Sequence, residues 1–459
     1  MTIRILPARL TQVDIVDELL VRYGQELRYD ASTKAWLTFS AVTGWTPDPY
    51  EARFRELCVI LARDLHATLA PEGLTRQEVK RWERTRVASV ERVQSAGGLR
   101  ALSDLASRRA PVIVESKDLD ASAHLLGAPN GVVNLRTGEL GAFLREELIT
   151  RRAAVRYNPE AECPRWERFL VEVLGEDPNT QSHLQRLFGY WLTGETREQK
   201  MHLLHGSGAN GKTTMIDTWR GVLGYNYAQT AAETVLIGKA GASNHSSELV
   251  RLKGVRFAQL SETDMGQSFH ESRLKSLVSG DDIAGRALFE NYQTISPVVK
   301  FVICTNNLPN VRGSDHGIWR RLVVVPFERT FDVDAGSDLD EVLASEHEGI
   351  LAWAVRGAVA YYQQRLGATP TAWQTATGDY RQEEDVIAAF LGACCTASAE
   401  GFVAASVLYK TYNSWCEVEG REALKQDAFG KRLSKSRRAR SERKGEQRRA
   451  HWVGIVLAQ

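Results

Sequence analysis

The spacing of apolar residues changes along this chain. From Leu10 to Tyr23 apolar side chains recur at helical intervals, and Arg76–Gln94 predicts a charged helix with one narrow apolar side. Around residues 125–140 the helical period is lost, and Asn130-Gly131 followed by apolar residues predicts a β-hairpin. Two further helices are expected within 166–192. The first third of the chain is therefore expected to be mainly helical, with one hairpin.

The middle of the chain combines two apolar patterns. Between about 198 and 330, short apolar runs typical of buried strands alternate with helical segments, which predicts a parallel sheet covered on both faces. Residues 335–385 are expected to form polar helices. The predicted fold class is α/β, with domains at 1–160, 161–335, 336–385 and 386–459.

Charge and cysteine content narrow the functional classes. The formal net charge is +1, so no global field draws the chain to nucleic acid, and such affinity must come from local patches. No apolar run approaches the ~18 residues that cross a membrane, and the first residues lack a secretion signal. The six cysteines show no metal-binding spacing, which favours reduced thiols in a cytosolic protein.

The segment Gly206–Thr213 matches the phosphate-binding pattern G-x-x-x-x-G-K-[ST] at every fixed position. An apolar run precedes it and a helical pattern follows it, which is the strand–loop–helix context that the motif requires. In such a loop Lys212 would reach the β- and γ-phosphates and Thr213 would ligate Mg²⁺. The expected nucleotide-binding residues are Gly206, Gly208, Asn210, Gly211, Lys212, Thr213 and Thr214.

A second apolar run ends at an acid fifty residues beyond Lys212. Glu262 is therefore expected to polarise the attacking water and to share the Mg²⁺ ion, although a plain strand with a surface acid would show the same residues. Many P-loop enzymes hold Mg²⁺ through a carboxylate just before this acid, whereas this chain has Ser261 there. Asp264 is close enough in sequence to take part in metal binding.

Two later motifs carry polar residues at the ends of predicted strands. An apolar run ends at Asn306-Asn307, where an uncharged amide could orient the lytic water; a turn at the strand end is the alternative. Arg320 and Arg321 directly precede another apolar run. An arginine at a subunit edge could stabilise charge on a neighbour's γ-phosphate, whereas a solvated strand end would need no function.

In this order and spacing the motifs resemble superfamily 3 helicases, and more closely the phage/plasmid primase–helicase family, relatives of the poxvirus primase–helicase. Three segments upstream of the loop also resemble the region that this family carries before its helicase core. They are 130–140, 157–166 and 187–194. The resemblance covers residues 125–330 well and the two ends loosely.

The resemblance implies a compact AAA+ ring ATPase, usually a hexamer, that uses ATP and Mg²⁺ to move along one DNA strand and separate the duplex. It implies that Lys212 and Thr213 bind phosphate and Mg²⁺, that Glu262 is the catalytic acid and that Asn306 is the sensor. It makes Arg321 the trans-acting finger, because Arg321 directly precedes the strand as the family finger does; Arg320 is the alternative.

The family also places a DNA-gripping hairpin between the acid and the sensor. Here that segment is 280–292, and its candidate DNA contacts are Arg286, Phe289 and Tyr292. Glu290 stands where a basic residue would suit a DNA channel, and burial of the two aromatic residues is an equal alternative.

The end of the chain carries a concentrated positive charge. Residues 431–449 hold ten basic and two acidic residues, between two predicted helices and a predicted closing strand. This pattern is typical of a winged-helix-like domain whose basic loop contacts DNA phosphates, although a solvated basic loop fits equally. The candidate contacts are Lys431, Arg432, Arg437 and Arg438.

These observations lead to a functional hypothesis. The chain is expected to be an ATP-dependent replicative helicase of a mobile element in a bacterial cell, cytoplasmic and nucleoid-associated. Its expected partners are single-stranded and forked DNA, further copies of itself, and a separate primase or initiator protein. Primer synthesis in this chain is not expected, because the first 125 residues show no convincing set of metal-binding carboxylates. The alternatives are a DNA-bound ATPase that loads or remodels a partner, and an origin-binding initiator without unwinding activity.

Overall fold

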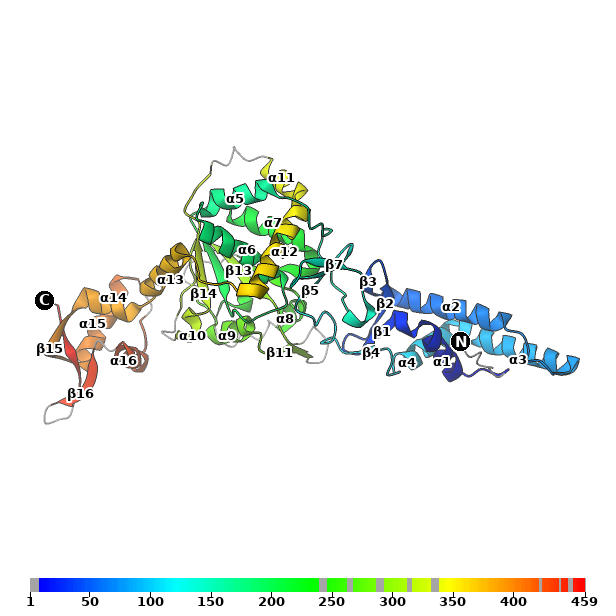
Figure 1. Cartoon of the computed structure of the whole chain (residues 1–459). Coiled ribbons are helices and arrows are strands. Elements are labelled where there is room, and N and C mark those ends of the chain that lie inside the picture. The colour runs from blue at the N-terminus through cyan, green and yellow to red at the C-terminus, as the bar shows by residue number, and fades with distance from the viewer. Residues whose placement is uncertain are drawn as a thin grey trace.

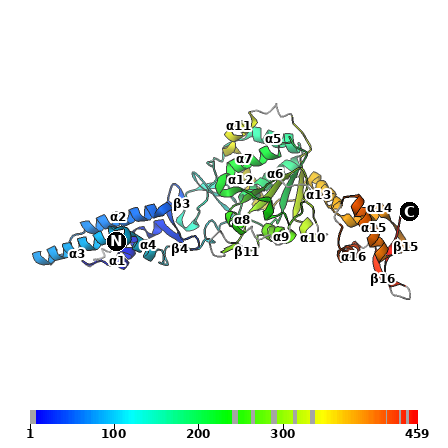
Figure 2. The ribbon, with the colours of Figure 1, turned by 180° about the vertical axis from the view of Figure 1, so that it is seen from behind.

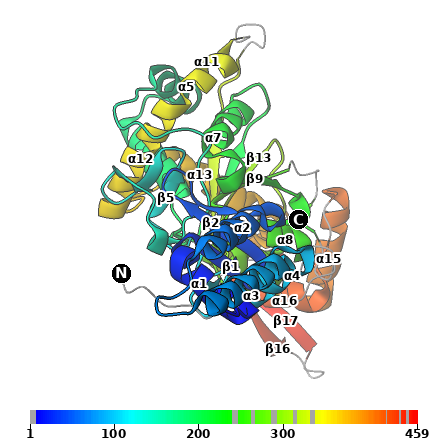
Figure 3. The same ribbon diagram turned by 90° about the vertical axis from the view of Figure 1, so that its right-hand side faces the viewer.

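The computed structural model describes residues 8–238, 246–261, 267–285, 293–311, 316–331, 338–420, 423–436, 439–444 and 449–458. The described chain is elongated, with an N-terminal part at one end, a large α/β core in the middle and a small C-terminal part at the other end (Figures 1 and 2). Viewed end-on, the N-terminal helices lie in front of the core (Figure 3).

The N-terminal part packs helices against a small sheet. Two of the helices begin at capping boxes. In each, a threonine side chain accepts the backbone N–H of an acid three residues later, and the side chain of that acid accepts the threonine backbone N–H. The pairs are Thr11 with Asp14 and Thr75 with Glu78. The helix predicted at 76–94 has those bounds. The elements are α1 (Gln12–Tyr23), β1 (Leu27–Asp30), β2 (Ala35–Ser40), β3 (Gly44–Pro47), α2 (Ala52–Ala67), α3 (Arg76–Gln94), α4 (Ala96–Ala106) and β4 (Ile113–Val114).

The sheet of this part has the order β3-β2-β1-β4 and was not expected from the sequence. Its last pair is parallel and joins Tyr29 to Ile113, so it depends on a contact between residues far apart in the chain. The expected hairpin follows as a three-stranded meander of β5 (Leu125–Ala128), β6 (Gly131–Asn134) and β7 (Glu139–Gly141). Gly131 at its first turn has φ 148°, and a Cβ there would lie 2.2 Å from the Gly141 carbonyl oxygen.

The core sheet is parallel, as the alternating pattern predicted. Its order is β14-β8-β13-β10-β9, so β8 lies between two strands that follow it late in the chain. Its strands are β8 (Met201–His205), β9 (Ala228–Ala231), β10 (Phe257–Leu260), β13 (Lys300–Thr305) and β14 (Leu322–Pro326).

Helices cover both faces of this sheet, which confirms the expectation of a two-sided α/β core. Alternate strand residues point to opposite faces; Leu204 joins one buried cluster and Leu203 the other. The first face carries α5 (Pro164–Leu174), α6 (Pro178–Leu192), α7 (Lys212–Tyr227), α11 (Leu339–Ser345) and α12 (His347–Gln364). The second carries α8 (Ser246–Arg251), α9 (Glu271–Ser279), α10 (His316–Trp319) and α13 (Thr371–Glu383).

Two buried cations tie the end of α6 to the sheet. The guanidinium of Arg256 donates to the carbonyl oxygens of Leu192 and Leu125, and the ammonium of Lys300 donates to those of Thr193 and Val298. Arg256 and Lys300 are each 2% exposed. Because a buried charge is costly unless hydrogen-bonded, these contacts fix α6 and the meander against β10 and β13.

The C-terminal part is a small domain with its own apolar core, centred on Phe390, Tyr412, Phe429 and Leu433. Its sheet has the order β15-β17-β16 and is antiparallel, which adds two strands to the one expected. Helices followed by a closing antiparallel ribbon give the winged-helix-like arrangement. The elements are α14 (Val386–Cys394), β15 (Cys395–Ala404), α15 (Ala405–Val418), α16 (Gln426–Lys435), β16 (Arg440–Lys444) and β17 (Arg449–Leu457).

Close packing of α6 on α12 requires glycine. A Cβ at Gly189 would lie 2.1 Å from the backbone nitrogen of Ala358, whereas a Cβ at Gly378 in α13 would meet nothing within 4 Å. We expect Gly189→Ala to destabilise the core by roughly 1–3 kcal/mol through overpacking, and Gly378→Ala to stabilise it by about 0.5–1 kcal/mol. Thermal unfolding of the two variants measures these opposite shifts; equal midpoints would contradict the packing.

Candidate functional site

The loop after β8 lies at the carboxyl edge of the core sheet. The strand register sets His205 beside Thr305 of β13 on one side and Pro326 of β14 on the other. Parallel strands bring their carboxyl ends to one edge, so the segment 206–211 meets the ends of both neighbours. The Gly206 N–H donates to the Thr305 oxygen at 3.4 Å, and the Phe327 N–H donates to the His205 oxygen at 2.7 Å.

The backbone of this loop depends on its glycines. Gly208 and Gly211 have φ values of 107° and 82°, in the left-handed region that other residues rarely adopt. A Cβ at Gly206 would lie 2.2 Å from the Phe327 oxygen, so that glycine also permits a close backbone approach. α7 begins at Lys212, and no described side chain caps it at Gly211. Its first N–H groups, including those of Thr213 and Thr214, therefore face the loop as anion-binding donors.

The Lys212 side chain joins three segments. Its ammonium donates to the Gly206 oxygen at 2.7 Å, to Asn210 Oδ1 at 3.0 Å and to Asn306 Oδ1 at 3.2 Å. Lys212 and Asn210 are 4% and 3% exposed, and Asn210 Nδ2 donates to the Phe327 oxygen at 3.3 Å. The structure thus brings together Lys212 and Asn306, two site residues that the sequence places far apart. A phosphate oxygen would be a stronger partner for this ammonium than the amide oxygens.

The expected catalytic acid follows the next strand of the same edge. β10 ends at Leu260, and the Ser261 N–H donates to the Ala231 oxygen at 3.2 Å. Glu262 and Asp264 lie outside the described residues. Among the described residues, no group of three or more His, Cys, Asp and Glu side chains forms a metal site.

The two arginines before β14 lie at the opposite, amino edge of the sheet. Arg321 is 8% exposed; its Nη1 donates to the Gly317 oxygen at 2.6 Å and its Nη2 to Ser279 Oγ at 2.8 Å. Arg320 is exposed, and its Nη2 donates to Gln199 Oε1 at 3.1 Å. Because β14 runs from this edge to the loop edge, neither arginine lies beside the loop of its own chain. The role of Arg321 as the finger stays a prediction.

The expected DNA contacts are described only in part. Arg286, Phe289, Tyr292 and Glu290 lie outside the described residues, as do Arg437 and Arg438. The strands on either side of 286–292, β11 (Ile283–Gly285) and β12 (Gln293–Ile295), pair antiparallel as the hairpin requires. Lys431 and Arg432 lie on α16, where Lys431 is exposed and Arg432 is half-buried.

One group of cations was not expected from the sequence. The structure places Lys200, just before β8, and Arg381 of α13 around the same cavity as Arg320. Nothing in the local pattern connects them, because they come from three separate segments.

Three family models match successive parts of the chain. Residues 17–175 match the family described as D5 N terminal like, residues 204–321 match a family of unknown function, and residues 382–452 match the Poxvirus D5 protein-like family. The D5-type regions therefore lie on both sides of the loop-bearing core.

Curated relatives come from large DNA viruses. A "Putative helicase" of Acanthamoeba polyphaga mimivirus is 27% identical over 218 residues, covering 47% of this chain and 23% of that protein. A "Putative primase" of African swine fever virus is 31% identical over 214 residues, covering 44% of this chain and 22% of that protein. A "Putative helicase" of Frog virus 3 is 27% identical over 262 residues, covering 52% and 26%. The chain spans about a quarter of the length of these relatives.

Solved structures show a similar fold. The apo C-terminal region of NrS-1 superimposes with a TM-score of 0.52 at 11% identity, covering 96% of this chain and 99% of that one. A second apo structure of that region gives 0.50 at 9% identity, covering 97% and 99%. The likeness extends over nearly the whole chain and concerns the fold alone.

The chain is a mixed α/β protein built on a parallel sheet, with D5-type regions before and after it. Its flanking regions match D5-type family models, and its relatives are viral proteins named putative helicases or primases, in agreement with the primase–helicase-like resemblance of the motifs. The relatives are viral and do not support the expected bacterial, nucleoid-associated setting. No helix in the described part of the chain is both long and apolar enough to cross a membrane.

The hydrogen bond between Lys212 and Asn306 leads to a prediction about how firmly the loop is held. We expect Asn306→Ala to raise the hydrogen-exchange rate of amides 206–213 about tenfold, because one hydrogen bond to a charged group is removed. Asn307→Ala, at the adjacent exposed asparagine, serves as the control. Equal exchange in both variants would show that Asn306 does not support the loop.

Proposed function

We propose that this chain is the motor part of a replicative DNA helicase. It is an AAA+ ATPase of the superfamily 3 type that binds ATP and Mg²⁺, assembles as a ring of copies and moves along single-stranded DNA. The observation that carries this proposal is the contact of the Lys212 ammonium with Asn306 at the carboxyl edge of the sheet. This contact supports the proposal because the two residues expected to bind and to sense the γ-phosphate are hydrogen-bonded to each other.

The chemistry follows from the residues at this edge. The N–H groups at the start of α7 and the Lys212 ammonium would hold the β- and γ-phosphates. Thr213 would ligate Mg²⁺, which neutralises charge as the γ-phosphate leaves. Glu262 would accept a proton from the attacking water, and Asn306 would orient that water. In this structure the same ammonium donates to Gly206, Asn210 and Asn306 oxygens.

The positions of the arginines support a site shared between copies. Both stand at the edge opposite the loop, so an arginine that stabilises the leaving γ-phosphate would come from a second chain. A head-to-tail contact forms a ring when its rotation closes, and we propose that it closes here as a hexamer. Arg321 would first have to leave its bonds to Gly317 and Ser279, whereas Arg320 would leave one exposed bond to Gln199.

Two parts of the chain would hold DNA. The hairpin between β11 and β12 would grip one strand in the ring channel through Arg286, Phe289 and Tyr292. The basic C-terminal domain would contact phosphates through Lys431, Arg432, Arg437 and Arg438, without reading sequence. Some relatives are named primases, but the chain matches them over about a fifth of their length, so primer synthesis is not part of this proposal.

Removal of the phosphate-binding lysine or the acid tests the motor directly. We expect Lys212→Ala to abolish ATP binding, and Glu262→Gln to keep binding but lower hydrolysis by roughly a hundredfold or more. Hydrolysis with and without single-stranded DNA, and unwinding of a forked duplex, are the measurements. Hydrolysis that drives no unwinding would favour a loader or remodeller instead.

The finger prediction has its own test in mixed assemblies. Arg321→Ala should lower hydrolysis by roughly a thousandfold, as removal of an arginine finger does. Mixing it with Lys212→Ala chains should restore activity, because each supplies the part that the other lacks. Arg320→Ala is the matched variant. If Arg320→Ala alone behaves in this way, Arg320 is the finger.

Salt dependence tests the C-terminal contacts. Replacing Lys431 and Arg432 with glutamine should weaken binding to single-stranded DNA of any sequence. The negative slope of log affinity against log salt should become less steep by about 0.7 for each phosphate that the protein no longer neutralises. Binding to labelled oligonucleotides over a range of NaCl measures it, with Lys410→Gln on α15 as the control. An unchanged slope would place the DNA-binding surface elsewhere.

A further inference from the structure

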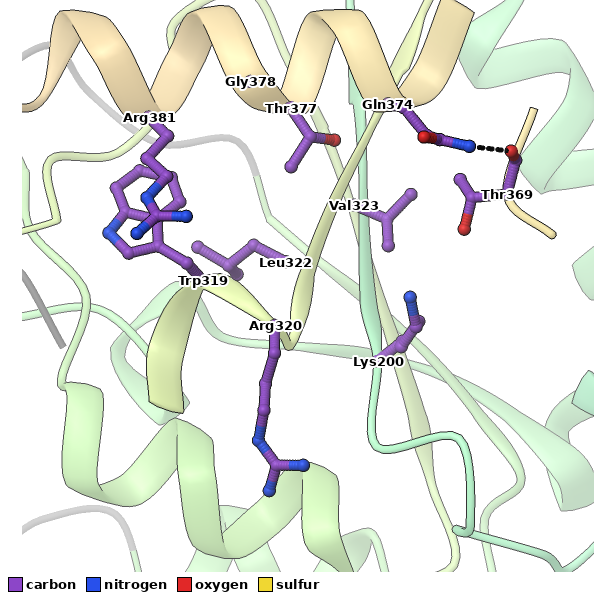
Figure 4. Close-up of a pocket in the computed structure, with 10 residues that line it drawn as sticks. All are labelled: Lys200, Trp319, Arg320, Leu322, Val323, Thr369, Gln374, Thr377, Gly378 and Arg381. Carbon is purple, nitrogen blue, oxygen red and sulfur yellow. Dashed lines mark hydrogen bonds between the residues drawn. The ribbon is translucent and has the colours of Figure 1, made fainter. Parts of the chain in front are cut away.

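A cavity of about 290 Å³ lies at the amino edge of the core sheet, between α13 and the start of β14 (Figure 4). Three cationic side chains line it: Lys200, Arg320 and Arg381. None of the described residues that line it is an aspartate or glutamate. Its polar lining also includes Thr369 and Gln374, which are hydrogen-bonded to each other through the Gln374 amide and the Thr369 oxygen.

No ion pair among the described residues holds the cations of this cavity. Within the described part of the chain, the Lys200 and Arg381 side chains make no hydrogen bond or ion pair, and Arg320 bonds the neutral amide of Gln199. Burial lowers the pKa of Lys200, against a weaker effect of Glu198 in the opposite direction. The nearby His183 and His202 stay neutral because burial lowers their pKa values to about 4 and about 3. A half-buried ammonium in a cavity lined by two arginines and by no described carboxylate favours an anionic partner.

Rigid elements set these cations around one space. Gln199 has φ 52°, which is unusual for a residue other than glycine, and this turn directs the chain past Lys200 into β8. α13 is fixed to the sheet because the Val324 N–H donates to Thr377 Oγ1 at 2.9 Å. Trp319 packs edge-on against Tyr380 of the same helix, with ring centroids 5.1 Å apart. The cavity is therefore held by β8, β14 and α13 together.

We propose that this cavity is a second phosphoryl-binding site, separate from the loop 206–213, in which Lys200 and Arg381 bind phosphate oxygens. Arg320 lines the same cavity, but its guanidinium points away from these two side chains and bonds Gln199 (Figure 4). Guanidinium forks match phosphate oxygens, and the lysine adds a point charge. The cavity and the loop lie at opposite edges of the sheet, so the phosphate does not belong to a nucleotide in the same chain's loop. It comes from a nucleotide on a second copy, which rests on the proposed function, or from a DNA backbone.

The test replaces the two cations that have no role in the proposed motor. Lys200→Gln and Arg381→Gln are made singly and together in the full chain, with Arg356→Gln, an exposed cation on α12, as the matched control. Lys200→Arg keeps the charge and should restore the wild-type behaviour. ATP affinity, ATP hydrolysis and the binding of a labelled oligothymidine over a range of NaCl are measured for each variant.

We expect hydrolysis or DNA affinity to be at least about tenfold lower in the double variant, while the control is unchanged. Lower hydrolysis at unchanged ATP affinity, restored by mixing with Lys212→Ala chains, identifies the nucleotide of a second copy. Lower DNA affinity, with a salt slope smaller by about 0.7 for each phosphate released, identifies the DNA backbone. If the double variant hydrolyses ATP and binds DNA as the wild type does, the proposal is wrong.

The proposed motor function can be disproved independently of the proposed phosphate site. If the wild-type chain does not hydrolyse ATP under any DNA condition, that function is wrong, and the cavity is then judged by DNA affinity alone. The thermal unfolding midpoint of each variant is also measured. A midpoint within a few degrees of the wild-type value shows that weaker binding does not result from misfolding.

Discussion

A buried ammonium needs oxygen partners, and the candidate site is organised by how Lys212 finds them. Among the described residues it donates to Gly206, directly after β8, to Asn210 in the loop and to Asn306, directly after β13. They can meet only because β8 pairs in parallel with β13, which brings both carboxyl ends to one edge. Hydrogen bonds therefore join the loop, the first turn of α7 and Asn306 into one unit.

The parallel sheet has a second consequence, because its two edges carry different chemistry. The carboxyl edge holds the glycine-rich loop and the polar ends of β10 and β13. The amino edge holds Arg320, Arg321 and the cavity beside α13. In the proposed ring, the candidate phosphate-binding loop on one edge would face the cations on the opposite edge of a second copy placed head-to-tail.

Burial of charge also links the flanking region to the core. Arg256, directly before β10, donates to the Leu125 oxygen in the meander and to the Leu192 oxygen at the end of α6. The meander lies within the part that matches the D5 N-terminal-like family, and β10 lies within the loop-bearing core. These hydrogen bonds make the two regions one packed body, so the flanking region is structural support for the sheet as well as a connection to the N-terminal part.

Local signals in the sequence determined the features that need only near neighbours. The loop 206–213, the helix 76–94 with its Thr75 cap and the turn at Gly131 all depend on residues within a few positions, and the alternating pattern was enough for the two-sided parallel core. Tertiary structure alone decided the small N-terminal sheet, where Tyr29 pairs with Ile113, and the contact of Lys212 with Asn306. It also decided the grouping of Lys200, Arg320 and Arg381. These pairings join distant segments through strand register and packing, and no local spacing of residue types encodes them.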